Sequence, residues 1–522
     1  IVNIMHNERG KILWIDDEID HLKPHILFLE EKGYKISTSD NGQNGVLKSK
    51  KEVFDLILLD QFMPGIDGIE VLKEIKENNP ALPVIMITKS EEEWLMDEAI
   101  SEKIEHFLIK PVNPSQIFIV CKQVLEDSQI KSDKAISGYL KEFQQIEIDI
   151  DNCEKIDDWW QIYNRLIKWE SEFEDYKEPS LVQILDEQVQ SCNHKFTKFI
   201  EEKYASWLFE EDRPILSNDI FLKAVKPILD NNEKVCLVVM DAMRLDQFMS
   251  LYPILAENFK IKINPSVSLL PSATPFSRNA IFSGLFPDQF CNKYPDQLEA
   301  MNLDKGSLNH LESEFLNDQL KRNNLSNISH HYHKIWKVDE GKRFLSKIDK
   351  YLNNDLIAIV VNFVDQLAHR RSESDVLKEM VPDEISYKKA VKAWYEKSWI
   401  RSVLTKLGSN GYKIVMTSDH GSIMVNKSTI VAADKNSSTG VRYKHGRNIN
   451  ASEKHSIDIR DLSKFRLPEI GYHTNYLLSK DDYYFLYPNE QNKYKTKLNG
   501  SFQHGGVSMQ EMMVPIMIMD PK

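Results

Sequence analysis

Short apolar segments, each of strand length and each ending in polar residues, are the feature that most limits how this 522-residue chain can fold. Four of them lie in the first quarter of the chain, at residues 11–15, 54–59, 83–87 and 106–109. Stretches with the helical spacing of apolar residues lie between them, at 71–75 and 91–100. Strands that alternate with helices in this way predict a parallel sheet with helices packed on it.

The same alternation returns after about residue 216, with strand candidates at 235–240, 356–363, 412–417, 483–487 and 514–519. The stretch between the two regions has no proline from Pro114 to Pro179, and apolar side chains recur there at helical spacing. We therefore expect an α/β protein with a first domain at 8–128, a helical bundle connector at 129–215 and a larger α/β domain at 216–522. The hydrophilic segment 426–460 is predicted to be a surface loop or insertion.

Composition limits the class of protein. Hydrophobic residues make up 42% and charged residues 28% of the chain, as in a globular protein, and the net charge of −13 disfavours a protein that coats DNA. The five cysteines are scattered without a C-x-x-C motif, which predicts reduced thiols in a cytoplasmic protein. The apolar runs are far shorter than the ~20 residues of a membrane helix, so no membrane span is expected.

Polar side chains stand at consecutive strand ends of the first domain. Asp16 and Asp17 follow the first strand, Asp60 ends the second, Thr88 the third, and Lys110 follows the fourth. Because the carboxyl ends of parallel strands form one edge of the sheet, these side chains should converge. Clustered carboxylates would hold a hard cation such as Mg²⁺, and the lysine and the hydroxyl would contact an acyl phosphate on Asp60.

The stretches WIDDE, LLDQFMPGIDG, ITKS and LIKP resemble the receiver domain of bacterial response regulators. That resemblance implies a flavodoxin-like, doubly wound parallel sheet and a sensor histidine kinase as phosphodonor. It makes Asp60 the phosphoacceptor, Thr88 and Lys110 the residues that read the phosphate, and Phe107 the switch aromatic. The ligands of Mg²⁺ would be Asp16, Asp17, Asp60 and the carbonyl of Phe62. A receiver alone is a switch, so the output must lie further along the chain.

No helix-turn-helix with a basic recognition helix follows. Acidic residues and histidines instead follow later strand candidates or stand near the C-terminus: Asp241, Asp365, His369, Asp419, His420 and His504. Asp365 and His369 are spaced i, i+4 and would share one face of a helix. Carboxylates and imidazoles without thiolates suit Zn²⁺ or Mn²⁺, with open positions for a substrate.

The segment 270–280 supplies hydroxyl groups that run into a helical pattern. A hydroxyl at a helix N-terminus benefits from the positive end of the helix dipole, which also favours a phosphoryl group, although capping the helix is the alternative role. A pair of metals would lower the pKa of such a hydroxyl and clamp the attacking and leaving oxygens. Basic residues that would contact the substrate phosphate are Arg244, Arg278, Arg442, Lys444 and Arg447, the last three on a segment expected to be solvated.

The order Asp, Thr, Asp-x₃-His, Asp-His, His resembles the alkaline phosphatase superfamily and, within it, the PglZ family. The resemblance implies an alkaline-phosphatase-like α/β fold with two Zn²⁺ ions. One zinc site would consist of Asp241, Thr274, Asp419 and His420, and the other of Asp365, His369 and His504. Thr274 would be the nucleophile, as the second hydroxyl of an L-P-[ST]-x-T pattern, with Ser272 as the alternative.

A receiver, a helical segment and a PglZ domain together resemble the response regulators of the type IX secretion system. That resemblance implies a two-component regulator whose output is a zinc-dependent phosphohydrolase, a phosphodiesterase for nucleotides or oligonucleotides. Phosphorylation would promote a homodimer through the face around Phe107. The alternative is a non-catalytic regulator that binds a sigma factor or a secretion-system component. The complete ligand set with its hydroxyl favours the enzyme, because binding alone needs no nucleophile.

Overall fold

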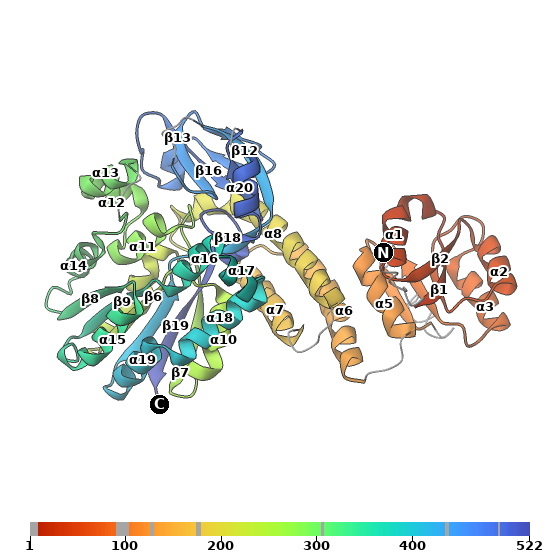
Figure 1. Cartoon of the computed structure of the whole chain (residues 1–522), viewed down its shortest axis with the longest axis horizontal. Coiled ribbons are helices and arrows are strands. Elements are labelled where there is room, and N and C mark those ends of the chain that lie inside the picture. The colour runs from red at the N-terminus through yellow and green to blue at the C-terminus, as the bar shows by residue number, and fades with distance from the viewer. Residues whose placement is uncertain are drawn as a thin grey trace. The chain divides into compact units, whose positions relative to one another are not determined.

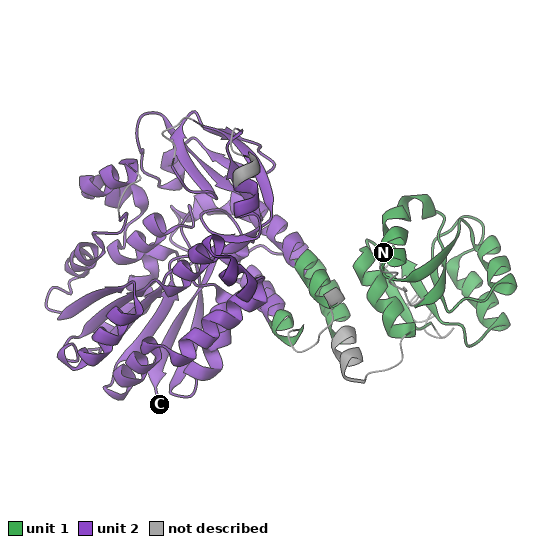
Figure 2. Cartoon of the chain, viewed as in Figure 1, with its two compact units in different colours: residues 1–148, 168–188 green, residues 149–167, 189–522 purple. Residues whose placement is uncertain are grey.

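The computed structural model describes residues 9–89, 104–125, 130–173, 179–303, 307–433, 438–488 and 491–522. The chain forms two compact units, shown in two colours in Figure 2. One consists of residues 1–148 and 168–188, and the other of residues 149–167 and 189–522. The predicted helix at 91–100 lies outside the described residues. No helix in the described part of the chain is both long and apolar enough to cross a membrane.

The N-terminal sheet has five parallel strands in the order β2-β1-β3-β4-β5, labelled in part in Figure 1. They are β1 (Gly10–Ile15), β2 (Tyr34–Ser39), β3 (Leu56–Asp60), β4 (Val84–Thr88) and β5 (His106–Ile109). The described helices of this domain are α1 (Lys23–Glu31), α2 (Gly42–Lys51), α3 (Gly68–Asn78) and α5 (Pro114–Leu125). This strand order is that of flavodoxin-like folds, so the predicted fold class is confirmed. The strand β2 was not predicted, because four of the six residues in its sequence YKISTS are polar.

Three long helices form the segment predicted to be a helical bundle: α6 (Ile130–Asp151), α7 (Ile156–Phe173) and α8 (Pro179–Trp207). Figure 1 labels these three helices. Aromatic side chains form part of their packing. In the unit that contains most of the chain, Trp159 contacts Phe196 and Phe199 with ring centroids 5.4 and 5.8 Å apart. The tryptophans at helical spacing therefore serve as packing core.

The C-terminal α/β domain is built on a six-stranded sheet of order β7-β19-β10-β6-β9-β8. Its strands are β7 (Phe259–Val267), β19 (Met513–Pro521), β10 (Lys413–Ser418), β6 (Val235–Met240), β9 (Leu356–Val361) and β8 (His330–Ile335). Four of them, β10, β6, β9 and β8, are parallel, and β19 runs antiparallel to β10 and β7. The predicted strand 356–363 ends earlier, because the chain enters α16 (Phe363–Glu373).

The core of this domain lies between the sheet and the helices α10 (Leu245–Leu255), α18 (Glu384–Lys397) and α19 (Trp399–Ser409). Fully buried side chains of the strands, such as Val238 and Ile359, pack against Phe248, Tyr387 and Ile400 of these helices. The inner strands β6, β9 and β10 are buried on both faces, as parallel strands generally are, whereas the edge strands β7 and β8 are only partly buried. The polar ends of the inner strands are left at one edge of the sheet.

Of the two alternatives predicted for 426–460, a surface loop or an insertion, the loop was wrong. This stretch contains β12 (Lys427–Ala432), β13 (Tyr443–Arg447), β14 (Asn450–Ala451) and β15 (Ser456–Ile459). They pair with β16 (Thr474–Ser479) and β17 (Tyr483–Leu486) in two small three-stranded sheets. Arg442, which precedes β13, is fully buried in an ion pair with Glu511. A charged side chain that is neutralised inside the protein cannot be distinguished by composition from a solvated one.

The C-terminal half of α8 fixes the loop after His504. The Asn193 amide accepts a hydrogen bond from the backbone N–H of Met509 at 2.8 Å and donates one to Gln510 Oε1 at 2.8 Å. The Thr197 hydroxyl donates to the carbonyl of Val507 at 3.4 Å. Asn193 and Thr197 are buried, so these bonds are shielded from water.

Candidate functional site

Three carboxylates meet at the carboxyl edge of the N-terminal sheet: Asp16, Asp17 and Asp60, called here the N-terminal carboxylates. Each offers one oxygen within 4.8 Å of the others. Asp16 and Asp60 are buried and Asp17 is exposed. The Lys110 ammonium lies 3.0 Å from Asp16 Oδ2 and 3.1 Å from Asp60 Oδ1. The convergence expected from the strand ends is therefore present.

The electrostatics of these carboxylates fit a divalent cation. Burial, and next the negative charge of Asp16, raise the pKa of Asp60 to about 6, although Lys110 opposes the shift. A hard cation among these oxygens would relieve that repulsion. Thr88 is buried at the end of β4, the Phe62 side chain is half exposed, and Phe107 lies partly buried on β5.

A first ligand group lies at the carboxyl ends of β6 and β10, and consists of Asp241, Asp419 and His420. All three are buried. His420 Nε2 lies 4.0 Å from Asp241 Oδ1 and 3.7 Å from Asp419 Oδ2. Thr274 opens α11 (Thr274–Ser283), and its hydroxyl lies 3.3 Å from Asp241 Oδ1 and 3.0 Å from His420 Nε2.

Backbone contacts set the orientation of His420. Its Nδ1 lies 2.9 Å from the carbonyl of Gly421, which leaves Nε2 directed at Thr274. A carbonyl at one ring nitrogen fixes the tautomer in which the other nitrogen has a free lone pair for a metal. Gly421 itself admits no side chain, because a Cβ there would lie 1.9 Å from the carbonyl oxygen of Gln510.

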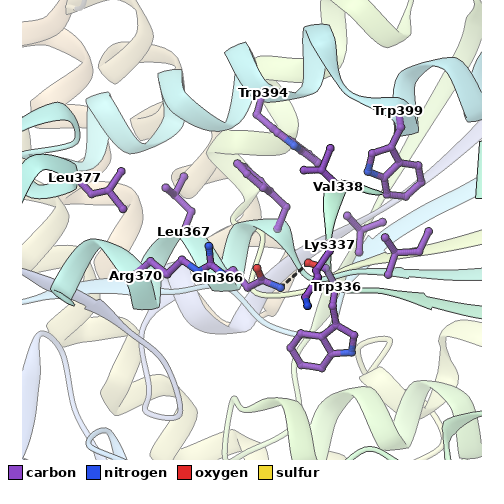
Figure 3. A pocket seen from close by; sticks show the side chains of 12 residues that line it. Trp336, Lys337, Val338, Gln366, Leu367, Arg370, Leu377, Trp394 and Trp399 are labelled. Carbon is purple, nitrogen blue, oxygen red and sulfur yellow. Dashed lines mark hydrogen bonds between the residues drawn. The ribbon is translucent and has the colours of Figure 1, made fainter. Parts of the chain in front are cut away.

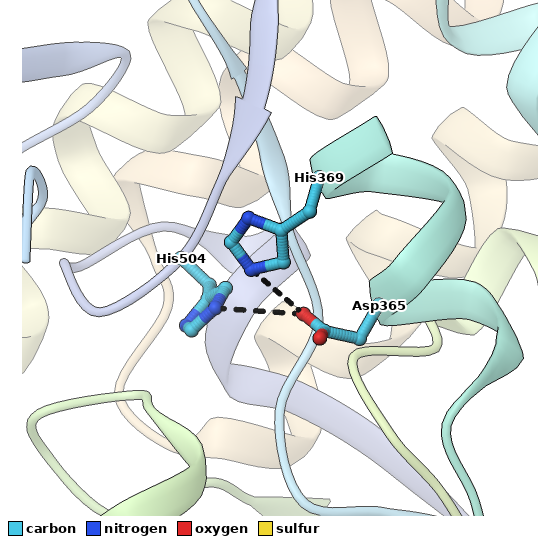
Figure 4. Close-up of side chains that lie close together, drawn as sticks. All are labelled: Asp365, His369 and His504. Carbon is cyan, nitrogen blue, oxygen red and sulfur yellow. Dashed lines mark ion pairs between the residues drawn. The ribbon is translucent and has the colours of Figure 1, made fainter. Parts of the chain in front are cut away.

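A second ligand group, shown in Figure 4, consists of Asp365 and His369 on α16 and His504 after β18 (Ser501–Gln503). Asp365 Oδ1 lies 3.2 Å from His369 Nε2 and 3.7 Å from His504 Nε2. The i, i+4 spacing predicted that the first two share a helix face, and the contact between them agrees. The rings of His420 and His504 stack with centroids 4.2 Å apart, so the two ligand groups adjoin. Paired-metal hydrolases place their ions about 4 Å apart.

Buried charge makes these groups suitable for metal ions. Burial strongly lowers the pKa of His504, which keeps it in the neutral form that a metal requires. Burial also disfavours the charged form of Asp241 and so raises its pKa, although the positive charge of Arg278 opposes this shift. Asp419 Oδ2 is buried and has no hydrogen-bond partner in the described part of the chain. A buried carboxylate oxygen without a hydrogen bond, near two further acids and three imidazoles, fits a site for a cation.

Arg278, predicted to contact substrate, lies among the acids. Its guanidinium is 2.5 Å from Asp241 Oδ2 and 3.8 Å from Asp419 Oδ2, and it also pairs with Glu312. Glu312 is in turn held by Lys334 at 3.1 Å and by the Tyr332 hydroxyl. Arg278 is thus a buried, clamped cation beside the first ligand group.

The other predicted phosphate anchors also have partners inside the protein. Arg244 is buried and pairs with Asp246 at 2.6 Å and Glu384 at 2.9 Å. Lys444, on β13, is buried and donates to the carbonyl of Ser438, so the expectation of a solvated loop was wrong for it as for Arg442. Arg447 ends β13 and is exposed.

The two hydroxyls of the L-P-[ST]-x-T pattern occupy different environments. Ser272 is fully buried, donates to the carbonyl of Gly506 at 2.7 Å and accepts from the N–H of Gly505 at 3.2 Å. Thr274 is partly accessible and faces the first ligand group. Ser272 therefore shapes the loop that carries His504, whereas Thr274 is available to a substrate.

Two residues of the site were missed. Asn362 Nδ2 donates to Asp241 Oδ2 at 2.7 Å, and Glu312 clamps Arg278. Asn362 directly follows the strand β9, so the rule that found the acids would have found it. Glu312, at the start of α14 (Glu312–Arg322), has no such signal in the sequence.

The fold and the two adjoining ligand groups define a class of protein: a flavodoxin-like domain joined by helices to an alkaline-phosphatase-like domain. Three family models match the chain in that order. They are the response regulator receiver domain at 12–122, the PorX response regulator linker domain at 129–208 and the PglZ alkaline phosphatase-like domain of the BREX system at 220–519. Since the last covers more than half of the chain, the protein belongs to the PglZ family, and the three matches together are those of a PorX-type response regulator.

Curated relatives are similar over part of their length. The transcriptional regulatory protein ResD of Bacillus subtilis (strain 168) is 36% identical over 115 residues, which are 22% of this chain and 48% of ResD. ZraR of Klebsiella oxytoca is 33% identical over 126 residues, which are 24% of this chain and 28% of ZraR. The chain thus spans about half or less of the length of these relatives.

Among solved structures, a CheY-like receiver domain protein from Methanospirillum hungatei JF-1 is 26% identical, with a TM-score of 0.22. It covers 22% of this chain and 94% of its own. Chemotaxis protein CheY4 of Vibrio cholerae is 27% identical, with a TM-score of 0.22, and covers 22% of this chain and 98% of its own.

Proposed function

We propose that this response regulator is phosphorylated on Asp60 by a sensor histidine kinase and acts through a zinc-dependent phosphodiesterase. Its substrates would be nucleotides or short oligonucleotides, and its biological role would be to regulate the type IX secretion system. One observation carries the enzymatic part of the proposal. The Thr274 hydroxyl lies 3.3 Å from Asp241 and 3.0 Å from His420, beside two adjoining groups of metal-type ligands.

The two ligand groups would each hold one Zn²⁺: Asp241, Asp419 and His420 with Thr274, and Asp365, His369 and His504. Zinc bound there would lower the pKa of a coordinated hydroxyl and polarise phosphoryl oxygens. The residues of the chain do the positioning. Thr274 is the first residue of α11, whose backbone N–H groups and dipole favour an anionic phosphoryl group. Contacts with Asp241 and His420 would keep the hydroxyl oxygen of Thr274 next to the first ligand group.

Hydrolysis would proceed in two balanced steps. Thr274 Oγ1 forms a bond to phosphorus while the ester bond to the leaving alcohol breaks, and the proton of the hydroxyl ends on that alcohol. Water then attacks the same phosphorus from the opposite side, the bond to Thr274 breaks, and the hydroxyl is restored. Arg278, clamped by Glu312, would keep Asp241 in place during both steps.

In the receiver, Asp16, Asp17 and Asp60 with the carbonyl of Phe62 would hold Mg²⁺. A phosphoryl group on Asp60 adds up to about two negative charges, which Lys110 and Thr88 would engage. The change would reach Phe107 and favour a symmetric pair of receivers, since twofold dimers are the commonest oligomers. Light scattering with and without beryllofluoride tests this step. The dimer fraction should rise on beryllofluoride binding, and an unchanged mass with confirmed binding would contradict it.

The decisive experiment measures bound metal and diester hydrolysis in the same preparation. Wild-type protein should contain about two zinc ions per chain and hydrolyse phosphodiesters. Thr274→Val should retain zinc and lose hydrolysis, whereas the matched control Thr405→Val, on an exposed position of α19, should behave as wild type. A protein that binds zinc yet hydrolyses neither monoesters nor diesters would favour the non-catalytic regulator that binds a sigma factor or secretion component.

A further inference from the structure

A pocket of about 430 Å³ lies on the flank of α16, outside both ligand groups (Figure 3). Its walls come from the ends of β8 and β9, from α16 and from the starts of α15 (Val338–Ser346) and α19. Most of the lining side chains are aromatic or aliphatic. Pockets of about 300–1,000 Å³ with apolar walls and a few polar groups are typical of small-molecule sites.

The pocket and the second ligand group share one helix. Asp365 and His369 face the metal-type ligands, and Gln366 and Arg370, the residues that follow each of them, line the pocket. Successive helical residues are turned by about 100°, and a helix with its side chains is about 10 Å across. A molecule bound at both places therefore spans roughly the width of one helix, which is within the length of a nucleotide.

Flat aromatic surfaces form two sides of the pocket. In Figure 3, Trp394 and Trp399 lie on one side and Trp336 on the other, with Lys337 and Gln366 between them. Phe363 stacks on Trp394 with ring centroids 4.0 Å apart and planes 5° apart, which holds that indole in place. Trp336 is 46% exposed, and its backbone carbonyl accepts a hydrogen bond from Gln366 at 2.7 Å. No aromatic ring of the described residues stacks on Trp336, although the Lys334 ammonium lies over its ring. An exposed indole of this kind is a surface on which a base can stack.

The rim of the pocket is positively charged. Lys337 and Arg370 are exposed, and neither has a carboxylate within 4.0 Å in the described ranges of the chain. Lys337 interacts electrostatically with Glu340, but neither cation is held in a short ion pair among the described residues, so both can contact an anion. Aromatic platforms flanked by unpaired cations are the combination with which proteins bind single-stranded nucleic acids.

Trp336 is also linked to the predicted nucleophile. The Lys334 ammonium lies 5.3 Å from the Trp336 ring and donates to the carbonyl of Asn309 at 3.1 Å. The Asn309 amide donates to the carbonyl of Thr274 at 3.1 Å. Contacts through Lys334 and Asn309 thus link the indole to the N-terminus of α11.

We propose that this pocket binds a nucleobase of the phosphodiester substrate, with the next phosphate held by Lys337 and Arg370. The proposal rests on the proposed function and deepens it, because it makes recognition depend on a base rather than on the phosphate alone. Trp336 is the residue on which the base stacks.

The test uses two esters that release the same 4-nitrophenolate: thymidine 5′-(4-nitrophenyl) phosphate, which carries a base, and methyl 4-nitrophenyl phosphate, which does not. The ratio of their kcat/KM values should fall about tenfold in Trp336→Ala, the loss expected for one base stacked on an aromatic ring. Trp336→Phe should keep the ratio within about twofold, because a ring remains. Tyr472→Ala, which removes an exposed aromatic ring elsewhere, is the matched control.

Three results separate the hypotheses. An unchanged ratio in Trp336→Ala, or an equal loss for both esters, would overturn the base pocket and leave the phosphodiesterase standing. If the wild type hydrolyses neither ester, the proposed function fails, and calorimetric titration of the zinc-loaded protein with thymidine 5′-monophosphate decides on the pocket. Binding weakened about tenfold in Trp336→Ala would support it. Equal binding by both proteins, or none by either, would overturn it.

Discussion

The N-terminal carboxylates and the first ligand group both lie at the carboxyl edge of a parallel sheet. They differ in the cation that faces their acidic side chains. In the receiver, three carboxylates face a lysine on a flexible stem, 3.0 Å from Asp16 and 3.1 Å from Asp60. In the PglZ domain, the acids of the first ligand group face Arg278, a planar cation that Glu312 fixes from behind. Lysine is a mobile point charge, whereas arginine binds carboxylates in a fixed fork.

This difference matches two different tasks. A switch must let its charge change, and a lysine can move from a carboxylate to a phosphoryl group without breaking a network. A catalytic centre must keep its geometry through each turnover, and buried hydrogen bonds on both sides of the arginine resist displacement. The choice of ligands follows the same division: oxygens alone in the receiver, oxygens with imidazoles in the PglZ domain.

The largest effect is expected when Asp60, the residue of the receiver whose charge should change, is replaced. Asp60→Asn should abolish labelling by acetyl phosphate, because Asp60 is the carboxylate at the end of β3 and lies 3.1 Å from the Lys110 ammonium. Intact-mass analysis in the presence of Mg²⁺ measures the label. The exposed Asp40→Asn should label as wild type, and equal labelling of Asp60→Asn would refute the assignment.

Replacing a proposed metal ligand of the PglZ domain should abolish the function of its first ligand group. Asp419→Ala should lower the zinc content by about one ion and hydrolysis by more than about a hundredfold, since even partners of metal ligands contribute ten- to hundredfold. Elemental analysis and a diester assay give both values. Asp375→Ala, at an exposed aspartate on α17 (Asp375–Met380), is the control. Full zinc content in Asp419→Ala would exclude this residue as a ligand.

The carboxyl group of Asp60 should make the stability of the receiver depend on pH. The pKa of Asp60 is about 6 in the folded state and 3.8 in an unperturbed aspartate, so the folded state binds the proton more tightly. In metal-free protein the contribution of Asp60 to the stability of the receiver should therefore be fully present below about pH 4, and about 2–3 kcal/mol should be lost as the pH rises through 6. Hydrogen exchange of β1 and β3 in EDTA measures the loss. Asp60→Asn should remove this dependence, and a receiver that gains stability over the same interval would contradict the raised pKa.

The smallest expected effect concerns the clamp on Arg278. Glu312→Gln keeps the shape of the side chain and removes its charge, so zinc should stay bound while kcat falls about tenfold, the cost of a charge-assisted hydrogen bond. KM should change less than kcat, because Glu312 contacts Arg278 rather than the substrate. The exposed Glu314→Gln on the same helix is the control. A loss of zinc equal to the loss of rate would show that Glu312 holds the metal site together instead.

Much of the site was predictable because its residues stand where strands end. Asp241, Asp365 and Asp419 follow apolar runs that could only be buried strands, and parallel strands bring their ends together. The same logic identified Asp60 and Lys110. The division into two ligand groups came instead from the resemblance to the alkaline phosphatase superfamily, because His369 lies on α16 and His504 follows β18, outside the main sheet.

The parts that were missed depend on pairing between polar groups. The sequence of β2 is mostly polar, and Arg442 and Lys444 are charged residues that the fold buries. Arg442 is neutralised by Glu511, 69 residues further along the chain. A sequence pattern records polarity and spacing, whereas a buried ion pair is specified only when distant segments meet.

The bonds from Asn193 and Thr197 to the loop after His504 affect how this protein can be divided. A fragment that begins at residue 216 would contain every proposed zinc ligand, yet the N–H of Met509 and the carbonyl of Val507 would lose the partners that α8 provides. A fragment of this chain that is meant to keep the loop after His504 in place must therefore include the second half of α8. The smallest transferable unit of the PglZ domain is thus longer than the α/β fold by half a helix.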